Sequence, residues 1–285
     1  MSSRMPRRSS RKPCVVVKSP YFSDSLPPKR RKPSSPKQTV IPHPATAKSR
    51  FFPRPPIDID SYLKDPRFVC FYEDFVAAMT ALYHAKPILI QDHVSADVWK
   101  VLVAVTLLNK TAGRLSVPIF FEILNTWPTP TSLAGASHTE LFAMIKDLGL
   151  GATRAHRLVS ISQTFLSQPP TPSTTYKSRG KTTSLSTSPT GELVLIEVDY
   201  PPTPISHIPG CGPYALDSYR IFCAGDEWKN VRPTDKELIR YLEWRWAVDK
   251  YRQWDPVHGP GAPIDLPYVH RLVESLANNP PIKSS

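Results

Sequence analysis

An apolar run, WKVLVAVTLL from Trp99 to Leu108, has hydrophobic residues on every side of a helix. This pattern predicts a helix that is buried all round, at the centre of a core. The segment VPIFFEILNTW follows and predicts a second helix, with Pro118 in the first turn, where proline is tolerated. The apolar residues of ATRAHRLVSISQTFL recur along one face, which predicts another helix.

Two segments carry signals for the ends of helices. In SHTELFAMIKDLG, Ser137 is the expected N-cap, Glu140 completes a capping box, and Gly149 ends the helix. In TDKELIRYLEWRW, Thr234 and Glu237 form a second predicted capping box. The aromatic residues that follow are expected to pack in the core: Trp244, Trp246 and Trp254.

Together these segments predict at least six helices and no clear sheet, and therefore an all-α domain over roughly residues 55–255. The stretch 167–204 is rich in Ser, Thr and Pro and is expected to be a flexible inserted loop. Within it, ELVLIEV (Glu192 to Val198) resembles a short strand, but no partner strand is apparent. Residues 256–285 are expected to form a C-terminal extension.

The charge of the chain is concentrated at its N-terminus. The formal net charge is +12, and residues 1–54 alone hold 14 lysines and arginines against one acid, Asp24. This segment, which includes SPYF and KRRK, is poor in bulky apolar residues and is expected to be a disordered basic tail. A basic arm on a near-neutral body is typical of proteins that bind a polyanion such as nucleic acid. The alternative is a merely solvated tail or a nuclear import signal.

Several function classes are disfavoured by the sequence. The cysteines are far apart and have no metal-ligand spacing: Cys14, Cys70, Cys211 and Cys223. We therefore expect no zinc or iron–sulfur site and no secreted disulfide framework. No apolar stretch reaches the ~18 residues of a membrane span, and the basic N-terminus lacks the apolar core of a secretory signal. A reducing intracellular compartment is expected.

The segment IPGCGPYALDSYRIFC, from Ile208 to Cys223, predicts a tight turn followed by a buried helix. Gly210 and Gly212 flank Cys211 and permit backbone conformations and close approaches that side chains would forbid. In a helix-hairpin-helix turn, the backbone N–H groups of the turn and of the next helix start point outward and suit a DNA phosphate. An ordinary connection between helices is the alternative.

A carboxylate is predicted at the start of the following helix. Asp235 comes directly after Thr234, at the expected first helical position, where the helix dipole favours its ionised form. By itself, such an Asp is most often only a favourable charge. Asp217, within the helix after the hairpin, is the rival carboxylate and is expected to be a buried or boundary residue with its hydrogen bonds satisfied.

The hairpin, the short spacer and the helix-initial Asp together resemble the helix-hairpin-helix DNA glycosylase superfamily, the relatives of endonuclease III. The resemblance is greatest to thymine glycosylase domains of the methyl-CpG-binding domain protein four type, although the tail shows no methyl-CpG-binding domain. It covers residues 87–250 apart from the insertion, and four motifs carry it: WKVLVAVTLLNKTAG, IKDLGLGATRA, DSYRIFC and the block from Trp228 to Asp235. The resemblance implies an all-α helix-hairpin-helix glycosylase fold.

It also implies a site that acts on an extruded base. The catalytic group would be Asp235, which stabilises positive charge on the sugar and orients the attacking water. Bifunctional relatives have a lysine where this chain has Tyr214, and a phenol cannot form an imine, so we expect a monofunctional enzyme. Tyr214 would contact the flipped pyrimidine. Gln91 matches a residue whose amide reads the thymine edge, because an amide both donates and accepts.

Two loops are implied to enter the DNA. Leu150 in LGLG would wedge into the base stack, and the alternative is a simple hydrophobic contact at a helix end. Asn109 and Lys110 in NKTAG would fill the vacated space, but relatives usually have Arg where this chain has Lys110. Arg154 and Lys181 are possible phosphate contacts, although nothing in the sequence distinguishes them from solvated charges.

The sequence therefore predicts a monofunctional glycosylase that removes thymine or uracil mispaired with guanine. Its expected partner is double-stranded DNA with G·T or G·U mismatches, bound by Gly210, Cys211, Gly212 and the two loops. No cofactor and no metal are expected, and we expect a nuclear monomer. The alternative is a non-catalytic helix-hairpin-helix DNA-binding module.

Overall fold

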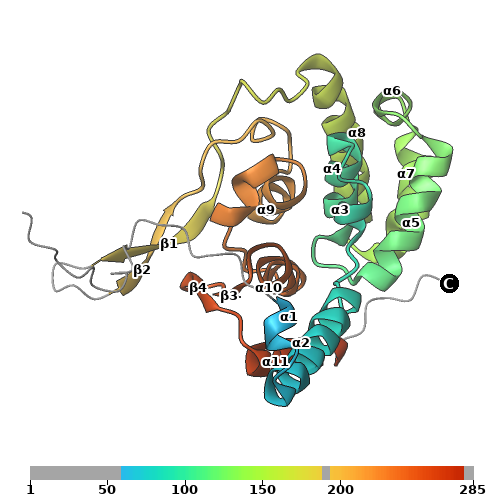
Figure 1. Ribbon diagram of the computed structural model, residues 1–285. Coiled ribbons are helices and arrows are strands. Elements are labelled where there is room, and N and C mark those ends of the chain that lie inside the picture. Colours follow the sequence, from blue (N-terminus) through green and yellow to red (C-terminus); the bar gives the residue numbers. More distant parts are fainter. Residues whose placement is uncertain (1–58, 188–192, 279–285) are drawn as a thin grey trace, which may run out of the picture. The chain divides into compact units, whose positions relative to one another are not determined.

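The computed structural model describes residues 59–187 and 193–278 (Figure 1). The expected basic tail, with SPYF, KRRK and Cys14, lies outside these residues. The helices are α1 (Ile59–Tyr62), α2 (Pro66–His84), α3 (Ile90–His93), α4 (Val98–Leu108), α5 (Gly113–Thr126), α6 (Pro130–Ala134), α7 (His138–Ile145), α8 (Gly151–Ser167), α9 (Pro213–Phe222), α10 (Lys236–Lys250) and α11 (Leu266–Ala277). Two 3-10 helices are η1 (Lys146–Leu148) and η2 (Gly225–Asn230), and the strands are β1 (Lys181–Thr187), β2 (Leu193–Asp199), β3 (Arg252–Asp255) and β4 (Gly259–Pro263).

Helix α4 is the central element, and the prediction of a helix buried on all sides is confirmed. Trp99 and every residue from Val101 to Leu107 are buried. Helices α5, α8 and α9 pack around it, and Figure 1 shows it between α9 and the pair α5 and α7. The indole Nε1 of Trp99 donates a hydrogen bond to Ser162 Oγ on α8 at 3.0 Å. The polar edge of this large aromatic ring is thereby satisfied inside the core.

The predicted helix ends are partly correct. Ser137 is the N-cap of α7, and its hydroxyl accepts from the backbone N–H of Glu140. Gly149 directly follows η1 with φ +77 and ψ 156, an extended conformation with positive φ that favours glycine. The expectation for Pro118 was wrong: α5 already begins at Gly113, so this proline lies inside the helix instead of in its first turn. An exposed proline inside a helix removes one intrahelical hydrogen bond.

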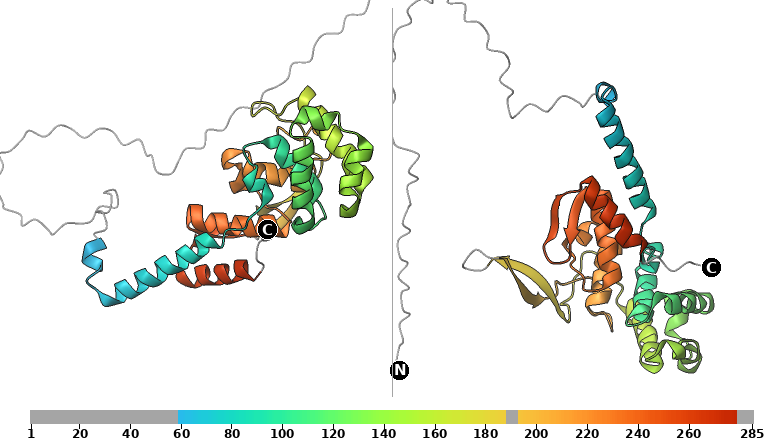
Figure 2. Two further views of the ribbon diagram at one scale, coloured as in Figure 1. Left: turned by 90° about the vertical axis from the view of Figure 1, so that its right-hand side faces the viewer. Right: turned by 90° about the horizontal axis from the view of Figure 1, so that it is seen from below.

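The second half of the chain builds two further hydrophobic clusters. One forms between α10, η2 and β3, and it contains the buried tryptophans Trp228, Trp246 and Trp254. The other joins α2, α10 and α11, around Trp244 and Leu272. The prediction that the late tryptophans pack in the core is confirmed. Helix α11 runs along α2 (Figure 2), so the packed unit continues beyond residue 255.

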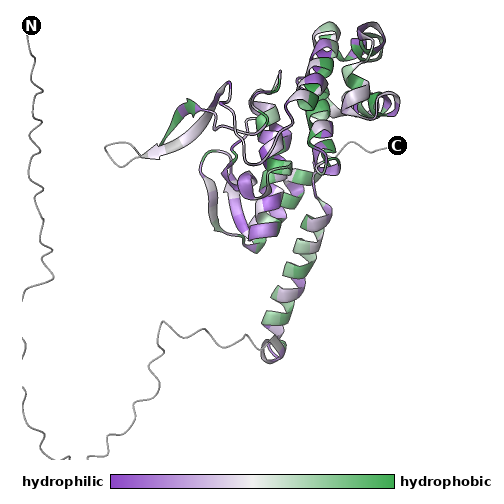
Figure 3. Ribbon diagram, turned by 90° about the horizontal axis from the view of Figure 1, so that it is seen from above, coloured by the Kyte–Doolittle hydropathy of each residue, from purple (hydrophilic) through white to green (hydrophobic). Residues whose placement is uncertain are grey.

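Helix α2 exposes part of its apolar surface. Figure 3 shows hydrophobic residues along this long helix, which leads to the grey trace. Four large side chains on it are between 42% and 65% exposed: Phe71, Tyr72, Val76 and Tyr83. None of the helices in the described ranges is both long enough and apolar enough to cross a membrane.

The expectation of a sheet-free domain was wrong within the insertion. Strands β1 and β2 form an antiparallel hairpin in which Lys181 pairs with Asp199 and Thr187 with Leu193. The partner strand was missed because KTTSLST is rich in Ser and Thr and has no apolar alternation, the usual sign of a strand. Strands β3 and β4 form a second small antiparallel sheet. The described residues are therefore mostly helical, with two short hairpins.

The insertion is anchored to α9 by a buried hydrogen bond. Tyr200, which follows β2, donates its phenol to Asp217 Oδ1 at 2.6 Å. Burial raises the pKa of Asp217 from 3.8 to about 6, although the bond from Tyr200 and the charge of Arg220 oppose the rise. The charge of Asp235 adds to the rise. Asp217 is therefore the buried, satisfied carboxylate that was expected.

This carboxyl predicts a pH dependence of stability. Between pH ~4 and ~6 the folded protein binds a proton at Asp217 that the unfolded chain has released, so the unfolding free energy falls as pH rises. D217N has no such proton. The wild type should therefore lose roughly 2–3 kcal/mol of unfolding free energy relative to D217N when the pH is raised from 4 to 7. Urea titrations at several pH values measure this difference, and a constant difference would contradict the raised pKa.

Candidate active site

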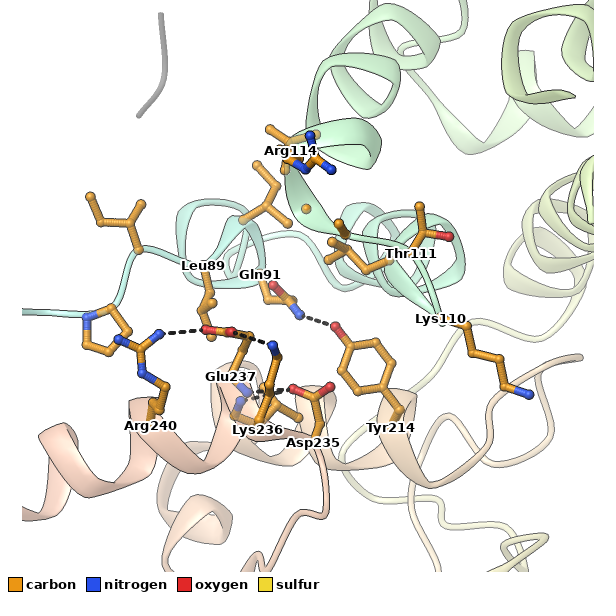
Figure 4. A pocket seen from close by; sticks show the side chains of 18 of the residues that line it. Leu89, Gln91, Lys110, Thr111, Arg114, Tyr214, Asp235, Lys236, Glu237 and Arg240 are labelled. Atoms are coloured by element: carbon orange, nitrogen blue, oxygen red, sulfur yellow. Dashed lines mark hydrogen bonds and ion pairs between the residues drawn. The ribbon is translucent and has the colours of Figure 1, made fainter. Parts of the chain in front are cut away.

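A cavity of about 520 Å³ lies between α3, the loop from α4 to α5, and the starts of α9 and α10. It brings together four of the predicted site residues, which come from separate parts of the sequence: Gln91, Lys110, Tyr214 and Asp235. Figure 4 shows Gln91 above Asp235, with Tyr214 beside both and Lys110 extending away from this group. Apolar residues from α3 to α5 complete the lining, among them Leu89, Leu108 and Val117.

Asp235 is positioned by the backbone of its own helix. It is the N-cap of α10, and its Oδ1 accepts from the N–H groups of Glu237 at 3.0 Å and Leu238 at 3.1 Å. Two bonds to one oxygen fix the carboxylate, and Oδ2 has no hydrogen bond within the described residues. The predicted capping box was wrong, because Asp235 itself takes the position assigned to Thr234. The carboxylate of Glu237 instead pairs with Arg240 at 3.1 Å.

Opposite this carboxylate lies an amide–phenol pair, in which Gln91 is buried and Tyr214 is half-buried. Gln91 is 2% exposed and donates Nε2–H to Tyr214 Oη at 2.9 Å (Figure 4). Burial, and secondarily the charge of Asp235, raise the pKa of Tyr214, so its phenol stays neutral at neutral pH. The Gln91 carbonyl and the Tyr214 hydroxyl proton are therefore both directed to one cavity, an acceptor beside a donor.

A second hydrogen bond fixes the position of α3 relative to α10, on the two sides of the cavity. Asp92, the residue after Gln91, accepts from Tyr241 Oη on α10 at 3.0 Å. Lys86 pairs with the other oxygen of Asp92 at 2.6 Å. The short helix α3 is thereby attached to the helix that Asp235 begins. The separation of Gln91 from Asp235 therefore depends on side-chain bonds as well as on the core.

Of the predicted loop residues, Lys110 lines this cavity and Leu150 lies on a neighbouring loop. Lys110 has φ +60 and Leu150 has φ +52, which are left-handed conformations that non-glycine residues rarely adopt. Leu150 is 67% exposed, between Gly149 and Gly151. Asn109 is exposed at the end of α4 and lines a smaller hollow instead of the main cavity.

The two basic residues that the sequence could not classify are both engaged. Arg154 is 3% exposed, and its guanidinium donates to oxygens of the two loops. It therefore does not present its charge to solvent. Lys181 forms an exposed ion pair with Asp199 across the β1–β2 hairpin. An exposed pair of this kind contributes ~0–1 kcal/mol.

The glycine hairpin differs in part from the expected geometry. A run of turns, not an α-helix, precedes Ile208. The N–H groups of Cys211 and Gly212 are bonded within the turn, to Ile208 O and Gly210 O. The first N–H groups of α9, those of Tyr214 and Ala215, have no acceptor within the helix. Burial raises the pKa of the Cys211 thiol to about 12, which makes it a neutral packing residue.

Sequence analysis missed two arginines beside this hairpin. Arg157 on α8 packs against Gly210 and lines the hollow that holds Asn109 and Gly212. Arg179, which precedes β1, lines a second hollow beside the glycines Gly210 and Gly212. Neither guanidinium has an ion pair within the described residues. No sequence signal predicts these positions, because the contacts join segments far apart in the chain.

No group of three or more His, Cys, Asp or Glu side chains that could hold a metal ion occurs in residues 59–187 and 193–278. The cavity is lined instead by the carboxylate of Asp235, the amide–phenol pair, the ion pair of Glu237 with Arg240, and three further basic residues, Lys110, Arg114 and Lys236. Such a site can bind a planar group with hydrogen-bonding edges and stabilise a positive charge next to it.

Comparison with curated proteins identifies relatives of this chain. It is 38% identical over 69 residues to a thymine-DNA glycosylase of Aeropyrum pernix and 42% identical over 69 residues to a thymine/uracil-DNA glycosylase of Pyrobaculum aerophilum. Each match covers 24% of this chain and 31% or 30% of the relative. A methyl-CpG-binding domain protein 4-like protein of Arabidopsis thaliana is 26% identical over 164 residues, 58% of this chain and 29% of the relative.

The chain thus spans about 30% of the length of these relatives, and no protein-family model matches it. The resemblance to DNA glycosylases that the four motifs indicated is confirmed by these matches.

The two hairpin glycines should respond differently to substitution. Gly210 has φ +83, and an added Cβ would lie 2.4 Å from Arg157 Cδ, so G210A should lower the unfolding free energy by about 1–3 kcal/mol. Gly212 has φ −93 and open space around an added Cβ, so G212A should change stability by less than ~0.5 kcal/mol. Thermal denaturation of both variants measures this contrast. Equal losses would show that the turn is packed differently.

Proposed function

We propose that this chain is a monofunctional DNA glycosylase that removes thymine or uracil mispaired with guanine. The observation that carries the proposal is the position of Asp235: a carboxylate with one fixed and one available oxygen, in a cavity opposite the amide–phenol pair of Gln91 and Tyr214. The names of two relatives, a thymine-DNA glycosylase and a thymine/uracil-DNA glycosylase, support the same chemistry. We expect a monomer that acts in the nucleus on double-stranded DNA and needs no cofactor.

The target base must leave the duplex to reach the cavity. Extrusion costs a few kcal/mol and is least costly for a mismatched pair, which favours G·T and G·U over normal pairs. Leu150 is exposed at a loop tip, where an apolar side chain can enter the stack, and Lys110 lies on the neighbouring loop. Because lysine lacks the planar fork of arginine, Lys110 contacts the orphaned strand as a point charge.

Inside the cavity, Gln91 and Tyr214 would read the Watson–Crick edge of the base. The carbonyl oxygen of Gln91 can accept from the N3–H of thymine or uracil, and the phenol of Tyr214 can donate to a ring carbonyl. Cytosine has an acceptor at N3 and is therefore a poorer match to the Gln91 carbonyl. The volume of about 520 Å³ also holds a pyrimidine with a C5 substituent.

Asp235 would then act on the sugar. Departure of the base builds positive charge at C1′, which Oδ2 of an ionised carboxylate stabilises across a short distance. The same oxygen can accept a proton from the water that attacks C1′. Oδ1 is bound to Glu237 N and Leu238 N, so little reorganisation of the carboxylate is required.

Binding of the DNA backbone would use the hairpin and its neighbours. The N–H groups at the start of α9, together with Arg157 and Arg179, form a positive surface beside Gly212, where no side chain obstructs a phosphate. The basic residues before position 55 would add phosphate neutralisation that weakens with salt. The alternative, a non-catalytic binding module, does not require a carboxylate oxygen without a hydrogen bond at the cavity.

The decisive experiment replaces the proposed catalytic oxygen without disturbing the helix. Asn is as good an N-cap as Asp, so D235N should keep α10 and DNA binding intact. Excision from G·T and G·U duplexes should nevertheless fall at least ~100-fold, because an amide does not stabilise the charge on the sugar. The measurement is single-turnover excision, with alkali to cleave abasic sites, alongside mismatch binding.

D235A is the matched control, because it should lose both the cap and the chemistry and destabilise the protein by about 1 kcal/mol. Normal excision by D235N would disprove the assigned mechanism. A wild type that binds the mismatch but excises neither base would favour the binding module.

A second experiment tests the monofunctional assignment. An imine requires a neutral amine at the sugar, and Tyr214 cannot supply one. Of the two lysines that line the cavity, Lys236 is paired with a carboxylate oxygen of Glu237 at 4.0 Å, and Lys110 extends away from Asp235. Borohydride added during turnover should therefore trap no covalent enzyme–DNA adduct, whereas Y214K should yield one. An adduct with the wild type that K236Q abolishes would show a lyase.

A further inference from the structure

One buried guanidinium joins two neighbouring loops, of which the loop from α4 to α5 lines the cavity. Arg154 Nη1 donates to Leu148 O at 2.7 Å and to Gly149 O at 2.9 Å. Its Nη2 donates to Asn109 O and to Thr111 Oγ1, both at 2.6 Å. All four acceptors are neutral oxygens on the loops, and the loops make one further direct bond, from Thr111 Oγ1 to Leu148 O at 3.3 Å.

The acceptors flank two strained residues. Within the described ranges, three non-glycine residues have positive φ: Lys110, Leu150 and Tyr251. Lys110 lies between the two acceptor residues of one loop, and Leu150 directly follows the two of the other. A left-handed conformation costs such residues ~1–2 kcal/mol, and neither a lysine nor a leucine has a side chain that offsets this locally. The surrounding bonds must therefore hold both residues in place.

The burial of Arg154 shows that these bonds are its main interactions. The residue is 3% exposed, and burial, followed by the nearby charge of Arg157, lowers the pKa of its guanidinium. Arginine remains charged even so, and charge-assisted hydrogen bonds to a rigid fork are stronger than neutral ones. Arg154 is also fixed from its own backbone, because its N–H donates to Leu150 O at 2.9 Å in the first turn of α8.

We propose that Arg154 is the positioning residue for DNA insertion: one guanidinium holds Lys110 and Leu150 in left-handed conformations, so that both side chains enter the duplex as one unit. The proposal rests on the proposed glycosylase function and deepens it. Arg154 touches neither the base nor the sugar. Its effect is confined to the step in which the target nucleotide leaves the stack and the two side chains occupy the gap.

The first test needs no DNA. In R154M, which keeps the length of the side chain and loses every donor, amide hydrogen exchange should accelerate at residues 109–111 and 148–150, while the buried residues of α4 stay protected. R157M is the matched control on the same helix, because Arg157 donates no hydrogen bond to either loop within the described residues. Unchanged exchange in the two loops of R154M would overturn the proposal.

The second test separates positioning from general stability. R154M should lower single-turnover excision of uracil from a G·U duplex by about 10- to 100-fold, because the inserting side chains are misplaced. With uracil opposite an abasic site, which is already unpaired and costs little to extrude, the loss should be less than about 3-fold. A merely structural role would reduce both rates by the same factor at a temperature where the variant is folded, and that result would overturn the proposal.

R154K serves where R154M fails to fold. A lysine keeps the charge but cannot reach acceptors on both loops at once, so it should recover part of the rate on the G·U duplex without restoring exchange protection in both loops. Full recovery of the excision rate and of the exchange protection would show that a positive charge alone suffices. It would contradict the proposal that one guanidinium must bond both loops. If the wild type excises neither substrate, the proposed function fails, while the exchange measurement still decides whether Arg154 holds the loops.

Discussion

The candidate site depends on one carboxylate for which we propose two tasks. Asp235 lines the cavity, its Oδ1 caps α10 through the N–H groups of Glu237 and Leu238, and its Oδ2 accepts no hydrogen bond within the described residues. A helix cap requires a hydrogen-bond acceptor at a fixed position. Cleavage of a glycosidic bond likewise requires a fixed, negatively charged oxygen beside the sugar. Because α10 is anchored in its own cluster by residues such as Leu238 and Leu242, the carboxylate takes its position from the core. No separate device is needed to orient it.

Other polar side chains around the site also connect separate elements of the fold. Asp92 receives the phenol of Tyr241 and thereby attaches α3, which carries Gln91, to the helix of Asp235. Arg154 joins the loops of Lys110 and Leu150. In each case a polar group with its hydrogen bonds satisfied, half-buried for Asp92 and buried for Arg154, connects elements whose relative position hydrophobic packing alone does not fix. Such groups stabilise little on balance, but they select one arrangement over near alternatives.

Sequence reasoning succeeded where the signal was local or where motifs were shared with known glycosylases. The buried helix around Val103, the cap at Ser137 and the cluster of Gln91, Tyr214 and Asp235 in one cavity follow from patterns within a few residues or from matched motifs. It failed where geometry is set by distant segments. Nothing near Arg154 indicates that its acceptors come from the end of α4, and the Ser/Thr composition of β1 concealed a strand that only β2 stabilises.

The insertion illustrates how such distant contacts could affect the site. It meets α9 at the open end of its hairpin: Tyr200 bonds Asp217, and a Cβ at Gly180 would lie 3.1 Å from Pro213, the first residue of α9. Helix α9 also begins beside the glycine hairpin and carries Tyr214. A segment that packs on the first turn of this helix therefore constrains the first N–H groups of the helix and the phenol together. It also places Arg179 beside the same glycines. A long loop with these contacts is part of the proposed DNA-binding surface and not a passive addition to it.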